Sequence, residues 1–99
     1  MNIMKVYLIK LKNDKKKYAV YIGDKVIKFG NSNYLDYTQH KNNVRKNRYL
    51  LRHYKNENCN DPYTAGFWAT NLLWNKQSIK QSIDDINSRY KIKVLKLAN

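Results

Sequence analysis

The chain is poor in acidic residues, in cysteine and in long apolar runs. Seven aspartate and glutamate residues stand against twenty lysine and arginine residues in 99 positions, so the formal net charge is +13 at pH 7. Cys59 is the only cysteine, which excludes an internal disulfide and leaves a structural zinc site without its usual partners. No apolar run approaches the roughly 20 residues of a membrane-spanning helix, and no signal peptide opens the chain. We therefore expect a soluble protein that is not secreted, with no membrane partner, no metal and no cofactor.

Length and composition indicate one folded domain over residues 1–99. This length suffices for one modest hydrophobic core. Hydrophobic residues make up 42% of the chain and charged residues 27%, which is typical of a globular protein rather than of a disordered basic tail. So strong a positive charge repels itself in the free protein, and a polyanionic partner explains it most simply. The first candidate partner is double-stranded DNA, and RNA stays open as an alternative.

The first thirty residues have the alternation and the β-branched and aromatic content of strands. Three strands are predicted, over residues 5–12, 17–22 and 25–29. Gly23 and Asp24 form a two-residue hairpin signal between the last two, because glycine tolerates positive φ. The tail Lys91–Leu97 begins with clean alternation, so it is predicted as a final strand that could join this meander.

A basic stripe is the sharpest feature of the first predicted helix, which runs from about His40 to Lys55 without glycine or proline. At spacings of four, three, four and three, five cations fall within roughly 80° of arc. They are Lys41, Arg45, Arg48, Arg52 and Lys55. The opposite side is predicted to be the apolar one, with Val44, Leu50, Leu51 and Tyr54. Because stacked cations repel one another and no acid lies between Gln39 and Asn56, we expect this stripe to bind phosphates; a solvated helix face is the alternative.

Two further helices are predicted. One begins at Asp61-Pro62, where aspartate can cap and proline suits the first turn, and runs to about Trp74. The other begins with the capping-box form of Ser78 to Gln81 and repeats apolar residues every three or four positions. The predicted fold class is α+β. A small antiparallel sheet, made of the N-terminal three-stranded meander and a C-terminal strand that could join it, packs against two or three helices.

Lysines of the sheet are expected to form a second positive surface for a further stretch of DNA or a second duplex. They are Lys10, Lys12, Lys15, Lys16, Lys17, Lys91 and Lys93. Aromatic rings interleaved with this charge can stack on bases or wedge between base steps. Trp68 and Trp74 lie among apolar residues and are predicted core, whereas Tyr49, beside the basic stripe, is the predicted aromatic contact.

No arrangement of catalytic residues stands out. His40 and His53 are thirteen residues apart, on different turns of the predicted helix, so one ion could not bridge them without outside ligands. We expect them to help bind phosphate or to cap the helix. Asp84 and Asp85 are expected to be solubilising charge on the third helix. The sequence therefore predicts no enzyme.

Several motifs keep their order along roughly residues 28 to 90. They are Phe29-Gly30, Tyr34–Lys41, Arg45–Tyr49, Arg52-His53, Lys55–Glu57, Asp61–Trp68 and Leu72–Lys76. In them the chain resembles a family of small basic proteins of large nucleocytoplasmic DNA viruses, of the mimivirus and phycodnavirus kind. It departs from that pattern at Cys59, where an aromatic residue is expected, and at Asn42, where an acid is expected. The family has no established activity, so the resemblance implies a viral setting, either the virion interior or the cytoplasm of the host cell.

The predicted function is sequence-nonspecific binding of double-stranded DNA, with compaction, bending or bridging of a viral genome as the expected role. A different class of function is a structural protein of the virion, whose cationic surfaces meet acidic protein surfaces. A nuclease is the third interpretation.

Overall fold

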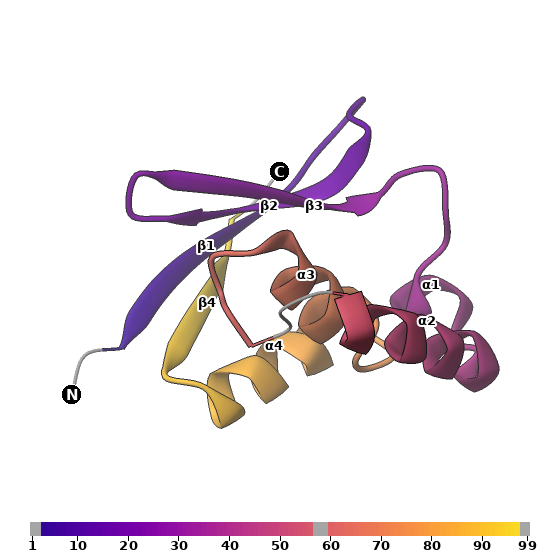
Figure 1. Cartoon of the computed structure of the whole chain (residues 1–99). Coiled ribbons are helices and arrows are strands. Elements are labelled where there is room, and N and C mark those ends of the chain that lie inside the picture. The colour runs from indigo at the N-terminus through magenta and orange to yellow at the C-terminus, as the bar shows by residue number, and fades with distance from the viewer. Residues whose placement is uncertain (1–2, 57–59, 98–99) are drawn as a thin grey trace.

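A four-stranded sheet carries the helices on one of its faces (Figure 1). The computed structural model describes residues 3–56 and 60–97 of the chain, and it describes no side chains for residues 54–56. The strands are β1 (Met4–Lys10), β2 (Lys16–Ile22), β3 (Lys25–Asn31) and β4 (Ile92–Lys96), in the order β3-β2-β1-β4. The first three form the predicted antiparallel meander, and the tail joins it as a fourth strand. The predicted α+β fold is therefore confirmed.

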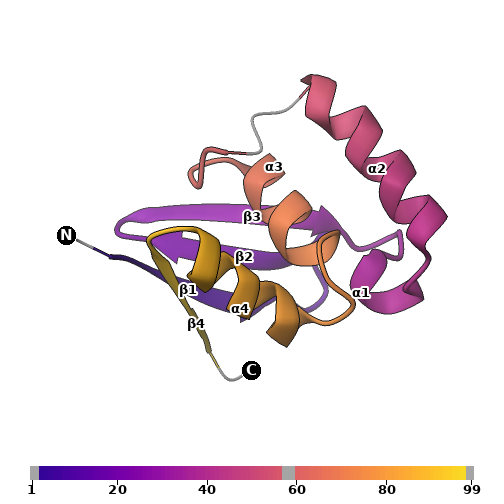
Figure 2. The same cartoon turned by 90° about the horizontal axis from the view of Figure 1, so that it is seen from below.

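The C-terminal strand β4 joins the sheet parallel to β1, so the sheet is mixed rather than antiparallel. Met4 pairs with Ile92 and Leu8 with Lys96 along this edge. The chain leaves β3, passes through all the helical segments and returns at the end of the sheet where β1 begins (Figure 2). A parallel pair needs such a long crossover, which the helices supply.

Side chains that point from the sheet toward the helices build one hydrophobic core. Val6, Leu8 and Val20 are fully buried, at the spacing of two that places residues on one face of a strand. They meet buried side chains of the helical segments, namely Phe67, Trp68, Leu72, Leu73 and Ile86. Burial of each such side chain contributes about 1.5–3 kcal/mol. Trp68 is core as predicted, and its Nε1 donates to the carbonyl oxygen of Pro62 at 2.7 Å.

The first predicted helix, from about His40 to Lys55, starts later than predicted, because a short separate helix and a sharp turn precede it. α1 (Tyr37–His40) ends at Lys41, which adopts a left-handed conformation with φ of 55°. α2 (Asn43–Asn56) then begins after Asn42, whose Oδ1 accepts from the backbone N–H of Val44 at 3.0 Å and of Arg45 at 3.1 Å. Asparagine is a strong helix cap. The prediction of one continuous helix from His40 was therefore wrong in its first turn.

The other two helical segments lie close to their predicted places. α3 (Ala65–Trp68) begins after the cap Thr64, rather than at Asp61-Pro62, and continues into the π-helical turn η1 (Ala69–Leu73). α4 (Ile79–Arg89) starts at the predicted Ser78, whose Oγ accepts from the backbone N–H of Gln81 at 3.1 Å.

The helix α2 stands at the edge of the molecule, beyond the end of the sheet where β3 finishes (Figure 2). The segments α3 and η1 contact β3, and α4 contacts β4, whereas α2 lies beyond α3 and η1 (Figure 2). No helix within residues 3–56 and 60–97 is both long enough and apolar enough to cross a membrane.

Candidate nucleic-acid interface

A groove of about 680 Å³ lies between α2, the loop after β3 and the η1 turn. One wall carries arginines of α2, the floor is aromatic, and the opposite wall holds an ion pair between the sheet and the loop. The lining residues come from α2, from β2, from β3 and the loop after it and from the η1 turn, so the groove exists only in the folded chain.

The arginine wall consists of Arg45, Arg48 and Arg52, which all line the groove and are exposed. Their spacing of three and four residues places them on one side of α2, over about 10 Å of helix axis. No acidic residue occurs in α2. Within the described part of the chain, neither Arg45 nor Arg48 forms an ion pair with a carboxylate. The structure thus brings together these three members of the predicted stripe.

The two ends of the predicted stripe do not join this wall. Lys41 is exposed, but it lies in the left-handed turn between α1 and α2 rather than on a helix, because Asn42 caps α2 after it. Its predicted place on the helical stripe was wrong. Lys55 falls within the range of α2, and its side chain lies outside the described residues.

Three aromatic rings are stacked beneath the arginines. The ring of Tyr49 lies parallel to that of Trp74, with centroids 4.2 Å apart, and stacks on that of His53 at 3.9 Å. Only 8% of Tyr49 is exposed. Tyr49 was predicted to contact nucleic acid, and because both faces of its ring are occupied by protein, no base can stack on it in this arrangement.

The packed side of α2 also differs from the predicted one. Val44 is 59% exposed and Leu51 is 68% exposed, although both belonged to the predicted apolar side. The residues that face the body of the protein are Tyr49, His53 and the half-buried Leu50. Rings rather than aliphatic side chains hold α2 in place, because the surface that it meets is Trp74.

His40 and His53 pack against these rings: the ring centroid of His40 lies 5.2 Å from that of Trp74, and His53 stacks on Tyr49. The Nδ1 of His40 accepts from the backbone N–H of Asn42 at 2.9 Å, and its Nε2 is buried without a partner among the described residues. Burial lowers the pKa of His40, and the charge of Arg45 lowers it further, while Asp36 opposes the shift. Both ring nitrogens of His53 are likewise buried and find no partner within residues 3–53 and 60–97.

The opposite wall is closed by a buried ion pair. Lys17 Nζ lies 2.7 Å from Asp36 Oδ2 and donates to Gln39 Oε1 at 2.6 Å. The side chains of Lys17 and Asp36 are only 13% and 4% exposed. Lys17 was predicted to bind nucleic acid, but its ammonium is already committed to the carboxylate that caps α1. Because Asp36 is neutralised in this way, the groove keeps the positive potential of the arginines.

The remaining predicted lysines form two groups rather than one surface. Lys10, Lys12, Lys15 and Lys16 are exposed around the hairpin that joins β1 to β2. Lys91 and Lys93 are exposed where β4 begins, next to the start of β1, because β4 runs parallel to β1. The length of β1, about 20 Å, separates the two groups. The predicted single positive surface of the sheet was therefore wrong in its geometry.

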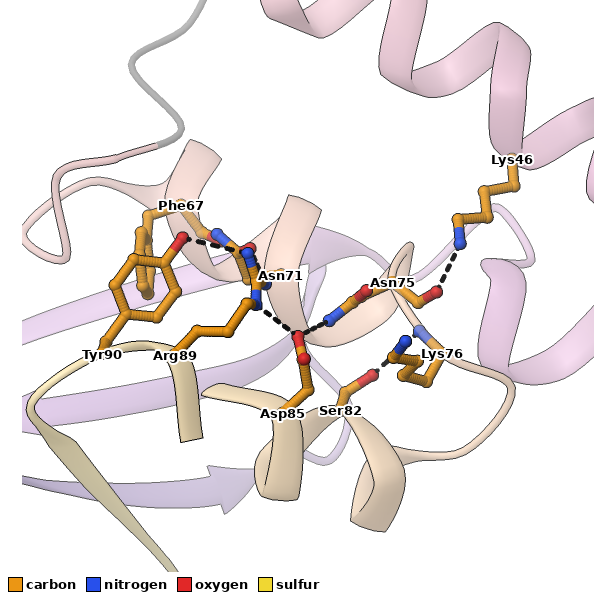
Figure 3. Close-up of polar contacts among 9 residues, drawn as sticks. All are labelled: Lys46, Phe67, Asn71, Asn75, Lys76, Ser82, Asp85, Arg89 and Tyr90. Carbon is orange, nitrogen blue, oxygen red and sulfur yellow. Dashed lines mark hydrogen bonds and ion pairs between the residues drawn. The ribbon is translucent and has the colours of Figure 1, made fainter. Parts of the chain in front are cut away.

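A chain of polar contacts connects α2 with η1 and α4 (Figure 3). Lys46 Nζ donates to the carbonyl oxygen of Asn75 at 2.6 Å, and Asn75 Nδ2 donates to Asp85 Oδ2 at 2.6 Å. Arg89 Nε donates to the same carboxylate at 2.7 Å, and Arg89 Nη2 donates to Asn71 Oδ1 at 2.9 Å. These contacts fix the position of the η1–α4 loop, and thereby of Trp74 under the groove.

Asp85 is therefore a structural residue and not the solubilising charge that the sequence suggested. Burial acts to raise the pKa of Asp85, but hydrogen bonds from Asn75 and Arg89 outweigh burial and hold that pKa below its usual value. Asp84, in contrast, is exposed as expected and pairs with Lys80 at 3.2 Å. No three potential metal ligands come together in the described part of the chain.

Comparison with known proteins gives one family. Neither the curated proteins nor the solved structures contain a match to the chain. Residues 6–53, just under half of the chain, match a family of unknown function (DUF5754), and this segment includes Lys17, Asp36 and the three arginines of the groove.

Proposed function

We propose that the protein binds double-stranded DNA without sequence preference, through the phosphate backbone. The observation that carries this proposal is the row of Arg45, Arg48 and Arg52 on an exposed side of α2, a helix without a single acid. Like charges so placed repel one another in the free protein, and phosphates relieve that repulsion. A guanidinium also matches a phosphate with two parallel hydrogen bonds.

The contacts that hold α2 in place leave its arginines open to a duplex. Its arginines span about 10 Å, which is comparable with three steps of 3.4 Å along one strand of a duplex. The stack of Tyr49 on Trp74 and the contact of Lys46 with Asn75 hold the helix while its arginine side stays open. Such a prearranged row loses less conformational entropy on binding than arginines on a loose segment.

The role we propose is architectural, namely compaction, bending or bridging of DNA. The exposed lysines at the β1–β2 hairpin lie apart from α2 and supply a second cationic group, which bending or bridging of DNA requires. On the sequence resemblance described above, the proposed setting is the particle of a large DNA virus or the cytoplasm of its host.

A second candidate function is attachment to another protein of the particle. Val44 and Leu51 form exposed apolar surface on α2, and the arginines lie on the adjoining side of that helix. An acidic protein surface with an apolar centre would complement this combination. Specific complex formation with such a protein, together with weak DNA binding at physiological salt, would favour this candidate over the first.

The proposed function is tested by the salt dependence of DNA affinity in the double variant Arg48→Gln/Arg52→Gln. Each phosphate contact contributes about 0.9 to the slope of log affinity against log salt, so the slope should become shallower by about two. A matched control is Lys25→Gln/Lys96→Gln, which removes the same charge from exposed lysines of the strands β3 and β4. Lys25 follows the β2–β3 turn, at the end of the sheet opposite α2 (Figure 2).

The two variants separate a local site from a general effect of charge. A shallower slope in the arginine variant, with the slope of the control nearly unchanged, supports the assignment to α2. Equal changes in both variants would contradict it, because bulk charge alone would then account for binding.

A further inference from the structure

The face of the sheet that points away from the helices is uncovered (Figure 1). Since side chains alternate along a strand, the neighbours of the buried Val6, Leu8 and Val20 point to this open face. Among them, Tyr7 of β1 and Tyr21 of β2 lie directly opposite each other in the antiparallel register. They are 40% and 38% exposed.

The two tyrosines are the centre of a row that crosses all four strands. Val26 of β3 pairs with Tyr21, and Leu95 of β4 pairs with Tyr7, so apolar side chains flank the two rings. Large hydrophobic side chains are seldom gathered on a solvent-exposed face unless that face binds something. The open face is thus a flat aromatic platform.

Cations lie beside this platform. Lys5 and Lys93 are paired in register one row further along β1 and β4, on the same face, and both are exposed. Lysine occurs in each of the four strands, and none of the strands contains aspartate or glutamate. The platform therefore has rings in its middle and positive charge at its end, with no acid on the strands to compensate that charge.

We infer that this open face binds single-stranded nucleic acid, with bases stacked on Tyr7 and Tyr21 and phosphates held by Lys5 and Lys93. Aromatic rings combined with a positive track bind unpaired strands, because every base presents a π-face and the backbone is anionic. A duplex hides its bases, so it could not use the rings. The site is distinct from the arginine groove of α2 and does not depend on the function proposed for that groove.

A second copy of the chain is a poorer occupant of this face. Two sheets meeting through it would bring Lys5 and Lys93 of both copies together in a protein whose charge is already +13. Repulsion of this kind disfavours association, whereas it strengthens the attraction of a polyanion.

The test is the affinity of the whole chain for a fluorescent oligothymidine of about 15 nucleotides. Removal of both rings in Tyr7→Leu/Tyr21→Leu should weaken binding by about tenfold per ring. The matched control Tyr7→Phe/Tyr21→Phe keeps both rings and should stay within about threefold of the original affinity. The variant Lys5→Gln/Lys93→Gln should make the salt slope shallower by about 1.4.

Controls separate this site from the groove and from a folding defect. The leucine variant should keep its duplex affinity and its cooperative unfolding, while Arg48→Gln/Arg52→Gln should keep most of its affinity for the oligothymidine. Unchanged oligothymidine binding in the folded leucine variant would overturn the inference. A dimer in sedimentation that the leucine variant dissolves would also overturn it, since the face would then be a contact between copies.

Discussion

Tyr49→Ala should lower the stability of the protein strongly, and Leu51→Ala, only two residues further along α2, should hardly change it. Tyr49 is 8% exposed and stacked between Trp74 and His53, whereas Leu51 is 68% exposed. A reading of the helix from its aliphatic residues alone would reverse this order. The pair therefore tests which side of α2 is packed.

The expected magnitudes follow from burial. Truncation of a large buried aromatic residue to alanine lowers the free energy of unfolding by about 3–5 kcal/mol. Because α2 lies at the edge of the molecule, we expect a value of about 3 kcal/mol for Tyr49→Ala. For a domain of this size that lowers the melting temperature by about 10 to 20 °C. Leu51→Ala removes only exposed surface and replaces leucine with a better helix former, so it should change the free energy of unfolding by less than about 0.5 kcal/mol.

Urea denaturation followed by tryptophan fluorescence measures both variants, with helix content by circular dichroism as a second readout. Loss of helix signal in Tyr49→Ala before global unfolding would show α2 detaching first. If Leu51→Ala proved the more destabilising of the two, the packing of α2 described above would be wrong.

Three further perturbations test other parts of the fold. Gly30→Ala should lower the free energy of unfolding by more than about 2 kcal/mol, because φ is +80° and the new Cβ would lie 2.7 Å from Leu73 Cδ1. Gly23→Ala, with φ of +60° and open space around it, should lower it by only about 1 kcal/mol in the same thermal unfolding experiment, and equal costs would contradict the close contact at Gly30. The free energy of unfolding should fall as pH drops below about 6.5, because the pKa of His40 is lowered in the folded protein and the unfolded chain therefore binds the proton at a higher pH. His40→Gln should flatten this part of the curve of stability against pH, and an unaltered curve would refute the assignment of this effect to His40. Asn71→Ala should lower the free energy of unfolding in urea by about 2–3 kcal/mol, because the carbonyl oxygen of Phe67 and Nη2 of Arg89 lose their hydrogen bonds to this buried side chain. A loss below about 0.5 kcal/mol would show that these hydrogen bonds contribute little to stability.

The strands and the last helix could be predicted because their signals are local. Alternation along β1 directly reflects one buried and one open face. Ser78, the first residue of the capping-box pattern, is the N-cap residue of α4, so this pattern predicted the start of the helix to the residue. The direction of β4 could not be predicted in the same way, since alternation is identical in parallel and antiparallel pairs. Direction depends on where the helices return the chain.

The sequence contains two helix-capping signals for the break between α1 and α2, and the spacing of the cations led us to predict one continuous helix instead. Asp36 and Gln39 have the spacing of a capping box, and the structure shows both of its hydrogen bonds. Asn42 is a strong cap residue at the place where α2 begins. Two starts within seven residues predict two helices, and Lys41 then falls in the turn between them.

The packed side of α2 lay beyond sequence reasoning because it depends on a distant partner. Trp74 lies 25 positions after Tyr49 in the chain, and only the fold brings their rings together. A helical wheel sorts residues by hydropathy, so it placed Val44 and Leu51 inside and Tyr49 outside. The arginines were predicted correctly as one row, since their spacing alone decides that they share a side.

The central claim is that the positive charge of this protein binds the phosphates of DNA. It is tested most directly by the affinity of the unmodified protein for a random duplex of about 30 base pairs between roughly 50 and 300 mM salt. Unlabelled RNA and heparin serve as competitors. With five to eight phosphates engaged, we predict a slope of about −4 to −7 and micromolar or tighter binding near about 150 mM salt. Loss of binding by about 150 mM salt would contradict the claim and would direct attention to an acidic protein partner instead.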